Sequence, residues 1–329
     1  MHIPENYLSP STCAVTTVAM VPVWASAVRH VRDEVPREKI PLIGIAAAFS
    51  FLAMMFNIPL PGGTTGHAVC GTLIAILFGP WSAVLAISIA LAIQAVFFGD
   101  GGILSFGANC FNMAFVLPFV GYAIYRAIAG DRPDLKRELI AAGIGSYIGL
   151  NVAALLCAFE FGIQPLLFHD AQGAALYCPY PLSVSIPAMM LGHLTVAGLA
   201  EAGFTVGILA FVRSAAPSFG IETRAASTNS LVPVLGLILV LVAACPLGLI
   251  ATGDAWGEWA TEDLAQMVGY TPQGLANGWE WNSFMPDYSV GSLPEWLGYV
   301  VSAVIGVALL VIIFRLAANA AKPTVNFEA

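Results

Sequence analysis

The sequence predicts an all-α fold, a polytopic membrane helix bundle of about nine transmembrane spans. Three observations predict it. Hydrophobic residues make up 58% of the 329 residues and charged residues only 10%, against about 25% charged in an average soluble domain. Apolar stretches near the roughly 20 residues that cross a bilayer recur along the chain. Basic residues fall only in alternate connections between these stretches. Because a soluble core cannot bury so much apolar surface, we expect lipid to surround the chain.

The apolar stretches differ in how well each would form a span. The nine predicted spans run approximately over residues 10–28, 40–57, 66–78, 81–98, 109–128, 139–160, 184–212, 231–251 and 294–315. The third is short and rich in glycine, which makes it the weakest independent span. Its end at Gly79-Pro80 is typical of a tight turn into the fourth span.

The basic residues predict how the bundle is oriented. All twelve fall in four clusters: Arg29, Arg32, Arg37 and Lys39; Arg126, Arg132, Lys136 and Arg137; Arg213 and Arg224; Arg315 and Lys322. The alternate connections contain none. The positive-inside rule then places the N-terminus on the outer side of the cytoplasmic membrane and the C-terminus on its cytoplasmic side. An odd number of spans also requires the two ends to lie on opposite sides. No basic residue precedes the first apolar stretch, so no cleavable signal peptide is predicted and Met1 should be the mature N-terminus.

A polar stretch of small residues divides the chain. Residues 216–230 are predicted to be a cytoplasmic linker between a seven-span core, residues 1–215, and a two-span region, residues 231–329. The two later spans flank a 42-residue outer segment with four of the seven tryptophans. None of the three lysines stands in a phosphate-binding G-x-x-x-x-G-K-[ST] loop. We therefore expect ATP hydrolysis to reside in other proteins.

The net charge of −8 is concentrated in the connections predicted to lie outside. An acidic outer face raises the local concentration of cations modestly. Positive-inside sorting leaves acidic residues outside in any case, and this simpler explanation is favoured. The six cysteines are scattered without a C-x-x-C pair, so they predict buried thiols rather than a thiolate metal site. Cys70, three residues after His67, is the one nearest a candidate ligand.

Two histidines at the predicted outer face form the most informative pair. The amine of Met1, the backbone nitrogen of His2 and the Nδ1 of His2 can close two chelate rings on one ion, and His67 can supply a fourth nitrogen. An all-nitrogen square plane suits nickel(II), copper(II) or low-spin cobalt(II). It suits zinc and magnesium poorly, since they prefer a tetrahedron and six oxygens respectively. Binding should release protons, because the amine and the amide must deprotonate.

Other polar residues lie within or beside the spans. Gln94 and Asp100 end the fourth span, and Asn109 and Asn112 begin the fifth. They could orient the free ring nitrogens of metal-bound histidines or make ordinary interhelical hydrogen bonds, and both interpretations stay open. His193 and Glu201, eight residues apart in the seventh span, are either functional or a structural polar pair near the inner half.

Four segments carry a resemblance to a known family: MHIPENYLSP, GGTTGHAVCG, FGDGGILSFGANCFNMAFVLPFVGY and PAMMLGHLTVAGLAEA. Residues 1 to about 215 closely resemble the CbiM/NikM family, the substrate-binding components of cobalt and nickel energy-coupling-factor transporters. Two segments depart from the family pattern, Glu5-Asn6-Tyr7 and Ala68-Val69-Cys70. Residues 230–320 are similar to the small accessory component fused in some members, through DAWGEWATEDL, which resembles a PDGLE pattern.

The resemblance implies a bundle whose N-terminus tucks into the outer side and binds metal through Met1, His2 and His67. It implies cobalt(II) or nickel(II) as transported substrate, without deciding between them, and no organic cofactor. It also implies a membrane coupling partner of the CbiQ/NikQ type and a cytoplasmic ATPase of the CbiO/NikO type, with lipid around the chain. No nucleic-acid partner and no catalytic residue are expected.

Two alternatives remain on the sequence. The first is a component of the same architecture that binds an organic vitamin, which would need an aromatic-lined pocket rather than Met1, His2 and His67. The second is an intramembrane metalloenzyme, which predicts H-E-x-x-H or a comparable motif. The sequence has no such motif.

Overall fold

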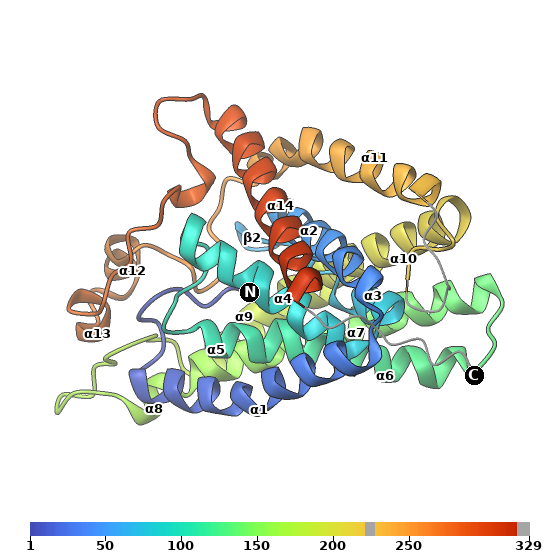
Figure 1. Ribbon diagram of the computed structural model, residues 1–329. Coiled ribbons are helices and arrows are strands. Elements are labelled where there is room, and N and C mark those ends of the chain that lie inside the picture. The colour runs from blue at the N-terminus through green and yellow to red at the C-terminus, as the bar shows by residue number, and fades with distance from the viewer. Residues whose placement is uncertain (221–227, 321–329) are drawn as a thin grey trace.

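The computed structural model describes residues 1–220 and 228–320, which are mostly helical (Figure 1). The α-helices are α1 (Pro10–Glu34), α2 (Ile40–Met55), α3 (Gly71–Phe78), α4 (Pro80–Ile93), α5 (Phe106–Asn109), α6 (Leu117–Ala129), α7 (Leu135–Gly162), α8 (Gln164–Leu167), α9 (Leu182–Gly192), α10 (Gly198–Ala215), α11 (Thr228–Ala244), α12 (Thr261–Val268), α13 (Gln273–Ala276) and α14 (Glu295–Ala320). Arg224 and Lys322, and part of the predicted linker, lie outside the described residues.

Shorter elements interrupt or connect these helices. Three π-helical turns, η2 (Gln94–Phe98), η3 (Cys110–Val116) and η4 (His193–Ala197), continue or join longer helices. Three 3₁₀ turns are η1 (Arg37–Lys39), η5 (Cys245–Ile250) and η6 (Pro286–Tyr288). The strands β1 (Ile58–Leu60) and β2 (Thr64–Gly66) form an antiparallel hairpin in which Ile58 pairs with Gly66.

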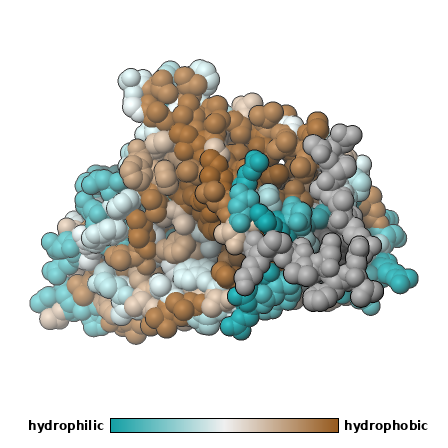
Figure 2. All heavy atoms as spheres, viewed as in Figure 1, coloured by the Kyte–Doolittle hydropathy of each residue, from teal (hydrophilic) through white to brown (hydrophobic). Residues whose placement is uncertain are grey.

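Eight helical segments in the described part of the chain are long and apolar enough to cross a membrane: Pro10–Glu34, Arg37–Met55, Pro80–Phe98, Phe106–Ala129, Leu135–Leu167, Leu182–Ala215, Leu231–Ile250 and Glu295–Ala320. This confirms the predicted all-α membrane bundle. Figure 2 shows hydrophobic residues over the middle of one face and hydrophilic residues gathered at the end of the molecule where α12 and α13 lie. We call this end the outer end, and the amine of Met1 contacts its connecting segment through Glu258.

The third predicted span is not a complete transmembrane helix, so the described residues contain eight such helices rather than nine. α3 has eight residues, which at 1.5 Å each rise about 12 Å, whereas the hydrocarbon core is about 30 Å thick. The preceding residues 67–70 form no regular secondary structure, and buried side chains bond the backbone of Val69 and Cys70. Ser50 Oγ donates to Val69 O (2.6 Å), and the amides of Val69 and Cys70 donate to Glu201 Oε2. Hydropathy alone did not distinguish this buried loop from a helix.

The segment that includes α3 nevertheless leads the chain away from the outer end. A Cβ built on Gly220 would lie 3.1 Å from the carbonyl oxygen of Leu77, near the end of α3. Lys39 Nζ, from a cluster predicted to lie inside, donates to Gly220 O (2.9 Å). α4 therefore starts at the opposite end from the N-terminus, which preserves the predicted alternation of connections.

Small residues allow the helices to approach closely. A Cβ on Gly145 of α7 would lie 2.5 Å from the carbonyl oxygen of Gly121 in α6. A Cβ on Gly44 of α2 would lie 2.7 Å from the Cβ of Phe314 in α14. The second contact packs the C-terminal region on the core, with α14 lying across α2 (Figure 1). Close backbone packing of this kind is typical of membrane helices.

Candidate metal centre

The first residues of the chain fold back into the outer end of the bundle. Met1, His2 and Ile3 are at most 4% exposed. The amide of Ile3 donates to Asn109 Oδ1 (2.7 Å), and its carbonyl accepts from Asn109 Nδ2 (3.1 Å) and Ser105 Oγ (2.6 Å). Both backbone groups of Ile3 are thus held by residues at or just before α5. This fixes the position of the two residues before it.

A second anchor holds the turn after Ile3. The carboxylate of Glu5 accepts hydrogen bonds from the amides of Ile103 (2.7 Å) and Leu104 (3.2 Å). The amide of Gly102 donates to Ile3 O (2.9 Å). A Cβ on Gly102 would lie 2.7 Å from the amide nitrogen of Glu5, so only glycine allows this close approach. Glu5, one of the departures from the family pattern, therefore helps to bind the N-terminal segment to the core.

The imidazoles of His2 and His67 meet at this position. His2 Nδ1 lies 3.3 Å from His67 Nε2, and the ring centroids are 4.9 Å apart. Metal–nitrogen bonds are about 2.0–2.1 Å long, so neighbouring ligands of a square plane lie about 2.9 Å apart. Burial, followed by the nearby N-terminal amine and His2, lowers the pKa of His67 well below its usual range. His67 is therefore neutral and can offer a lone pair to a cation.

The N-terminal amine is paired with a carboxylate from the C-terminal region. Met1 N lies 3.1 Å from Glu258 Oε1. Burial alone would lower the pKa of the amine, but the charge of Glu258 and its hydrogen bond outweigh burial, and the pKa is raised. A metal ion that binds the amine must therefore displace a proton held by this pair. Glu258 lies in the run that resembles the PDGLE pattern, but no pattern in the sequence predicts its contact with Met1.

Asp100 completes the ionisable groups around His2. Its Oδ1 lies 2.9 Å from His2 Nδ1, and its Oδ2 accepts from Tyr288 Oη (2.5 Å) and Gln94 Nε2 (3.1 Å). Burial opposes ionisation, but His2 and the hydrogen bonds from His2 and Tyr288 hold the pKa of Asp100 well below its usual range. Oxygen atoms of Asp100 and Glu258 and a ring nitrogen of His2 lie within 4.8 Å of one another.

The four residues predicted to support the ligands have different roles. Asp100 contacts His2 directly, Gln94 contacts Asp100, and Asn109 holds the backbone of Ile3. Asn112 instead donates to Glu160 Oε2 (2.6 Å) and has no hydrogen bond to the N-terminal segment. One helical turn separates the two asparagines, and that turn is π-helical from Cys110 onward.

His193 and Glu201 bond separate partners rather than each other. His193 Nδ1 lies 2.8 Å from Met189 O, whereas Glu201 Oε2 accepts from the amides of Val69 (2.7 Å) and Cys70 (2.9 Å). No direct hydrogen bond joins the two residues in the described structure. His193 lines a small pocket that Met1 also lines. Glu201 holds the loop that follows His67.

Cys70 contributes to this loop through its backbone. Its φ of 61° is a left-handed conformation that few non-glycine residues adopt, and Glu201 binds its amide. Burial and the Glu201 carboxylate raise the pKa of the thiol well above its usual range. The thiol is therefore protonated, whereas metal binding needs the thiolate.

Comparisons with known proteins agree with this architecture. The family described as "Cobalt uptake substrate-specific transmembrane region" matches residues 2–219, and the PDGLE domain matches residues 230–322. The chain belongs to the cobalt-uptake family. The family resemblance predicted from the sequence, including the fused accessory region, is thereby confirmed.

Relatives of similar length share both parts. The chain is 50% identical to the fused nickel transport protein NikMN of Rhodobacter capsulatus, over 94% of this chain and 95% of the relative. It is 46% identical to the probable fused nickel transport protein LarMN of Lactiplantibacillus plantarum, over 96% and 97%. A solved structure described as a truncated transition metal transporter superposes with a TM-score of 0.62 and 52% identity. It covers 65% of this chain and 99% of its own.

Proposed function

We propose that this member of the cobalt-uptake family binds nickel(II) or cobalt(II) outside the cell and delivers it inward, as the substrate-binding component of an energy-coupling-factor transporter. The observation that carries the proposal is the approach of His2 Nδ1 to His67 Nε2, at 3.3 Å, beside the buried N-terminal amine. The ligands would be the Met1 amine, the backbone nitrogen and Nδ1 of His2, and His67 Nε2. The ion is the transported substrate, and the chain itself catalyses no reaction.

The ligand chemistry supports these ions over zinc and magnesium. Nitrogen donors in a plane favour nickel(II) and low-spin cobalt(II), and binding must displace the protons held by the amine and the amide. Copper(II) would also fit the donors. The names of the two long relatives refer to nickel transport, which favours nickel within this pair.

Energy must come from other proteins. We place the chain in the cytoplasmic membrane with a coupling component of the CbiQ/NikQ type and an ATPase of the CbiO/NikO type. In this assembly residues 1–215 bind the ion, and residues 216–230 link them to residues 231–329. The last region covers the metal centre from the outer side. The contact between Glu258 and the Met1 amine supports a role of the third part in loading the ion.

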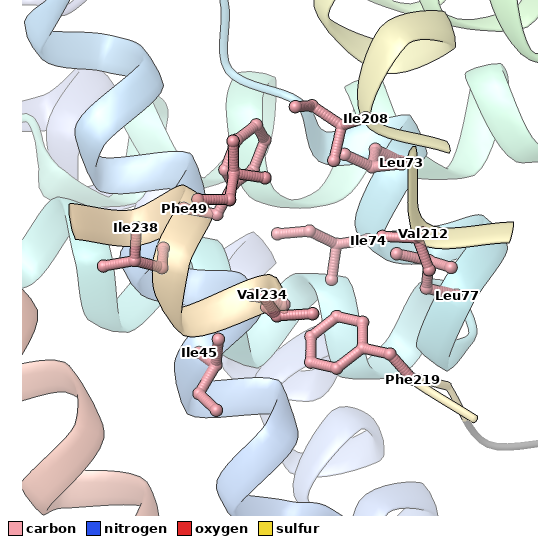
Figure 3. A pocket seen from close by; sticks show the side chains of 12 residues that line it. Ile45, Phe49, Leu73, Ile74, Leu77, Ile208, Val212, Phe219, Val234 and Ile238 are labelled. Carbon is pink, nitrogen blue, oxygen red and sulfur yellow. The ribbon is translucent and has the colours of Figure 1, made fainter. Parts of the chain in front are cut away.

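An organic vitamin as substrate is less well supported. An apolar pocket lies among α2, α3, α10 and α11 (Figure 3), but all its lining residues in the described structure are hydrophobic. They include Ile45, Phe49, Ile74 and Phe219. Sites for organic ligands combine an apolar surface with polar groups that fix orientation. This pocket offers no such group.

Metal binding to the purified full-length chain tests the proposal. We expect one nickel or cobalt ion per chain, measured by calorimetry and metal analysis with copper and zinc as competitors. His67→Ala, or one extra residue before Met1, should weaken binding by more than about 100-fold, beyond the cost of losing an outer-shell partner. His169→Ala is the matched control, since His169 is exposed in another loop. Tight binding that survives both changes would overturn the proposed chelate.

A further inference from the structure

A cleft of about 560 Å³ adjoins the metal centre. The core and the C-terminal region both line it, and His2 and His67 are among its lining residues. Five carboxylates also line it: Asp100, Asp254, Glu258, Asp287 and Glu295. Its described lining residues include no lysine or arginine. Part of the excess of acidic residues at the outer end is thus concentrated in this cleft.

The C-terminal region supplies four of the five carboxylates, all except Asp100. Asp100 and Glu258 bond His2 and the Met1 amine. Asp254, Asp287 and Glu295 take part in no ion pair within residues 1–220 and 228–320. Burial, and then the charges of Asp100 and Asp254, raise the pKa of Asp287. Asp287 is therefore close enough to Asp100 and Asp254 to be repelled by them, and a divalent cation between these carboxylates would relieve that repulsion.

A buried, unpartnered nitrogen also borders the cleft. His2 is 2% exposed and lines the cleft, and its Nε2 has no hydrogen-bond partner in the described structure. Beside this ring, oxygen atoms of Asp100 and Glu258 lie within 4.8 Å of one another and of a His2 nitrogen. The acidic cleft therefore leads to atoms of the kind that bind metal ions.

We propose that this cleft is a separate capture site for hydrated divalent cations, distinct from the nitrogen chelate. Asp254, Asp287 and Glu295 attract the hydrated ion, and Asp100 and Glu258 replace part of its water before it reaches Met1, His2 and His67. The inference rests on the proposed function and adds a step before it. Oxygen ligands and water discriminate poorly among divalent ions. The cleft therefore binds divalent ions with little selectivity, and the nitrogen chelate selects nickel(II) or cobalt(II) from among them.

This arrangement gives the fused C-terminal region a physical role. A cleft with walls of low dielectric and one sign of charge focuses the field and raises association rates by roughly 10- to 1000-fold. Because the region contributes most of the carboxylates, it accelerates loading without supplying a nitrogen ligand. Its unpaired carboxylates, Asp254, Asp287 and Glu295, should therefore change the rate of association and leave dissociation from the chelate unchanged.

Stopped-flow association of nickel with the purified full-length chain tests the capture site. We expect Asp254→Asn, Asp287→Asn and Glu295→Gln together to slow association by about tenfold or more, with the dissociation rate unchanged. The matched control combines Glu262→Gln, Asp263→Asn and Glu280→Gln. It removes the same charge from exposed residues of the same outer segment that do not line the cleft. Its association should stay within about twofold of the parent chain, because these charges do not line the cleft and its walls do not focus their field.

Two further measurements keep the outcomes distinct. In His67→Ala, manganese(II) followed by electron paramagnetic resonance should still bind weakly, and adding the three cleft substitutions should abolish this binding. The association rate of the unchanged chain should also fall steeply as salt rises. Equal rates in the cleft and control variants, or a rate that is insensitive to salt, would overturn the capture site. Tight nickel binding in the cleft variant would support the nitrogen chelate whatever the outcome for the capture site. Tight nickel binding in His67→Ala would overturn the chelate but not the capture site.

Discussion

The two segments that bring His2 and His67 together are anchored to different parts of the molecule. The N-terminal segment is held by residues before and within α5 and by the C-terminal region: Asn109 binds Ile3, Glu258 binds the Met1 amine, and Tyr7 Oη donates to Trp259 O (2.6 Å). The loop after His67 is held from within the bundle, where Ser50 and Glu201 bind its backbone.

This difference indicates how each half of the centre responds to change. Two amides of a non-helical backbone depend on one buried carboxylate, and unsatisfied amides in an apolar surrounding cost several kcal/mol. The N-terminal segment is instead held by several hydrogen bonds, and it lies at the more polar outer end. Loss of one anchor should therefore disturb His67 more than His2.

The largest expected effect follows from removing the inner anchor. Glu201→Ala leaves the amides of Val69 and Cys70 without their acceptor, and each buried donor left unsatisfied costs about 1–3 kcal/mol. We expect nickel affinity to fall by about 100-fold and thermal stability to fall with it. Calorimetry and thermal unfolding of the purified chain measure both.

A conservative variant separates the hydrogen bonds from the charge. Glu201→Gln keeps an acceptor oxygen and should recover most of the affinity. Glu160→Gln is the control, because Glu160 is a buried carboxylate that bonds Asn112 and not the His67 loop. Equal losses in Glu201→Ala and Glu160→Gln would mean that the loop is not held by Glu201 in particular.

A smaller effect is expected at the outer anchor. Asn109→Ala removes both hydrogen bonds to Ile3 but leaves those from Ser105 and Gly102. We expect nickel affinity to fall by about tenfold, at the lower end of the range for residues that support ligands. Asn112→Ala is the matched control, one turn along the same segment, and should leave affinity unchanged. A larger loss from Asn109→Ala than from Glu201→Ala would reverse the proposed difference between the anchors.

The parts of this arrangement that could be predicted from the sequence share a physical basis. Hydropathy and the alternation of basic residues depend on long stretches, so they indicated the helices without knowledge of contacts. The approach of His2 to His67 could be predicted from chelate chemistry. An N-terminal amine followed by His2 offers three nitrogen ligands, and His67 can supply the fourth. Both properties can be recognised without knowing which helices are neighbours.

The parts that were missed depend on contacts between distant residues or on local conformation. Apart from His67, residues 66–70 are apolar or small, so hydropathy included them in a span although residues 67–70 form a loop. The spacing of His193 and Glu201 places them on a similar helix face, but it cannot say that the backbone of Val69 lies opposite. The contact of Glu258 with Met1 joins residues 257 positions apart, and no local pattern predicts it.

The smallest expected effect concerns pH and tests the contact that joins the two regions. Glu258 raises the pKa of the Met1 amine, which in a free chain titrates near pH 8. Nickel binding needs the unprotonated amine, so affinity should fall as the pH drops below the raised pKa. Glu258→Gln should move this fall to lower pH, measured as dissociation constants between about pH 6 and 9, whereas Glu262→Gln should not.

The contact between Glu258 and the Met1 amine also predicts how the stability of the metal-free chain changes with pH. A group whose pKa is raised on folding stabilises the protein below its unfolded pKa, and this contribution is lost as pH rises through the folded pKa. The metal-free chain should therefore lose a small part of its thermal stability above about pH 8, and Glu258→Gln should remove that dependence. Identical pH profiles for Glu258→Gln and the parent chain would mean that the C-terminal region does not control the proton that the ion must displace.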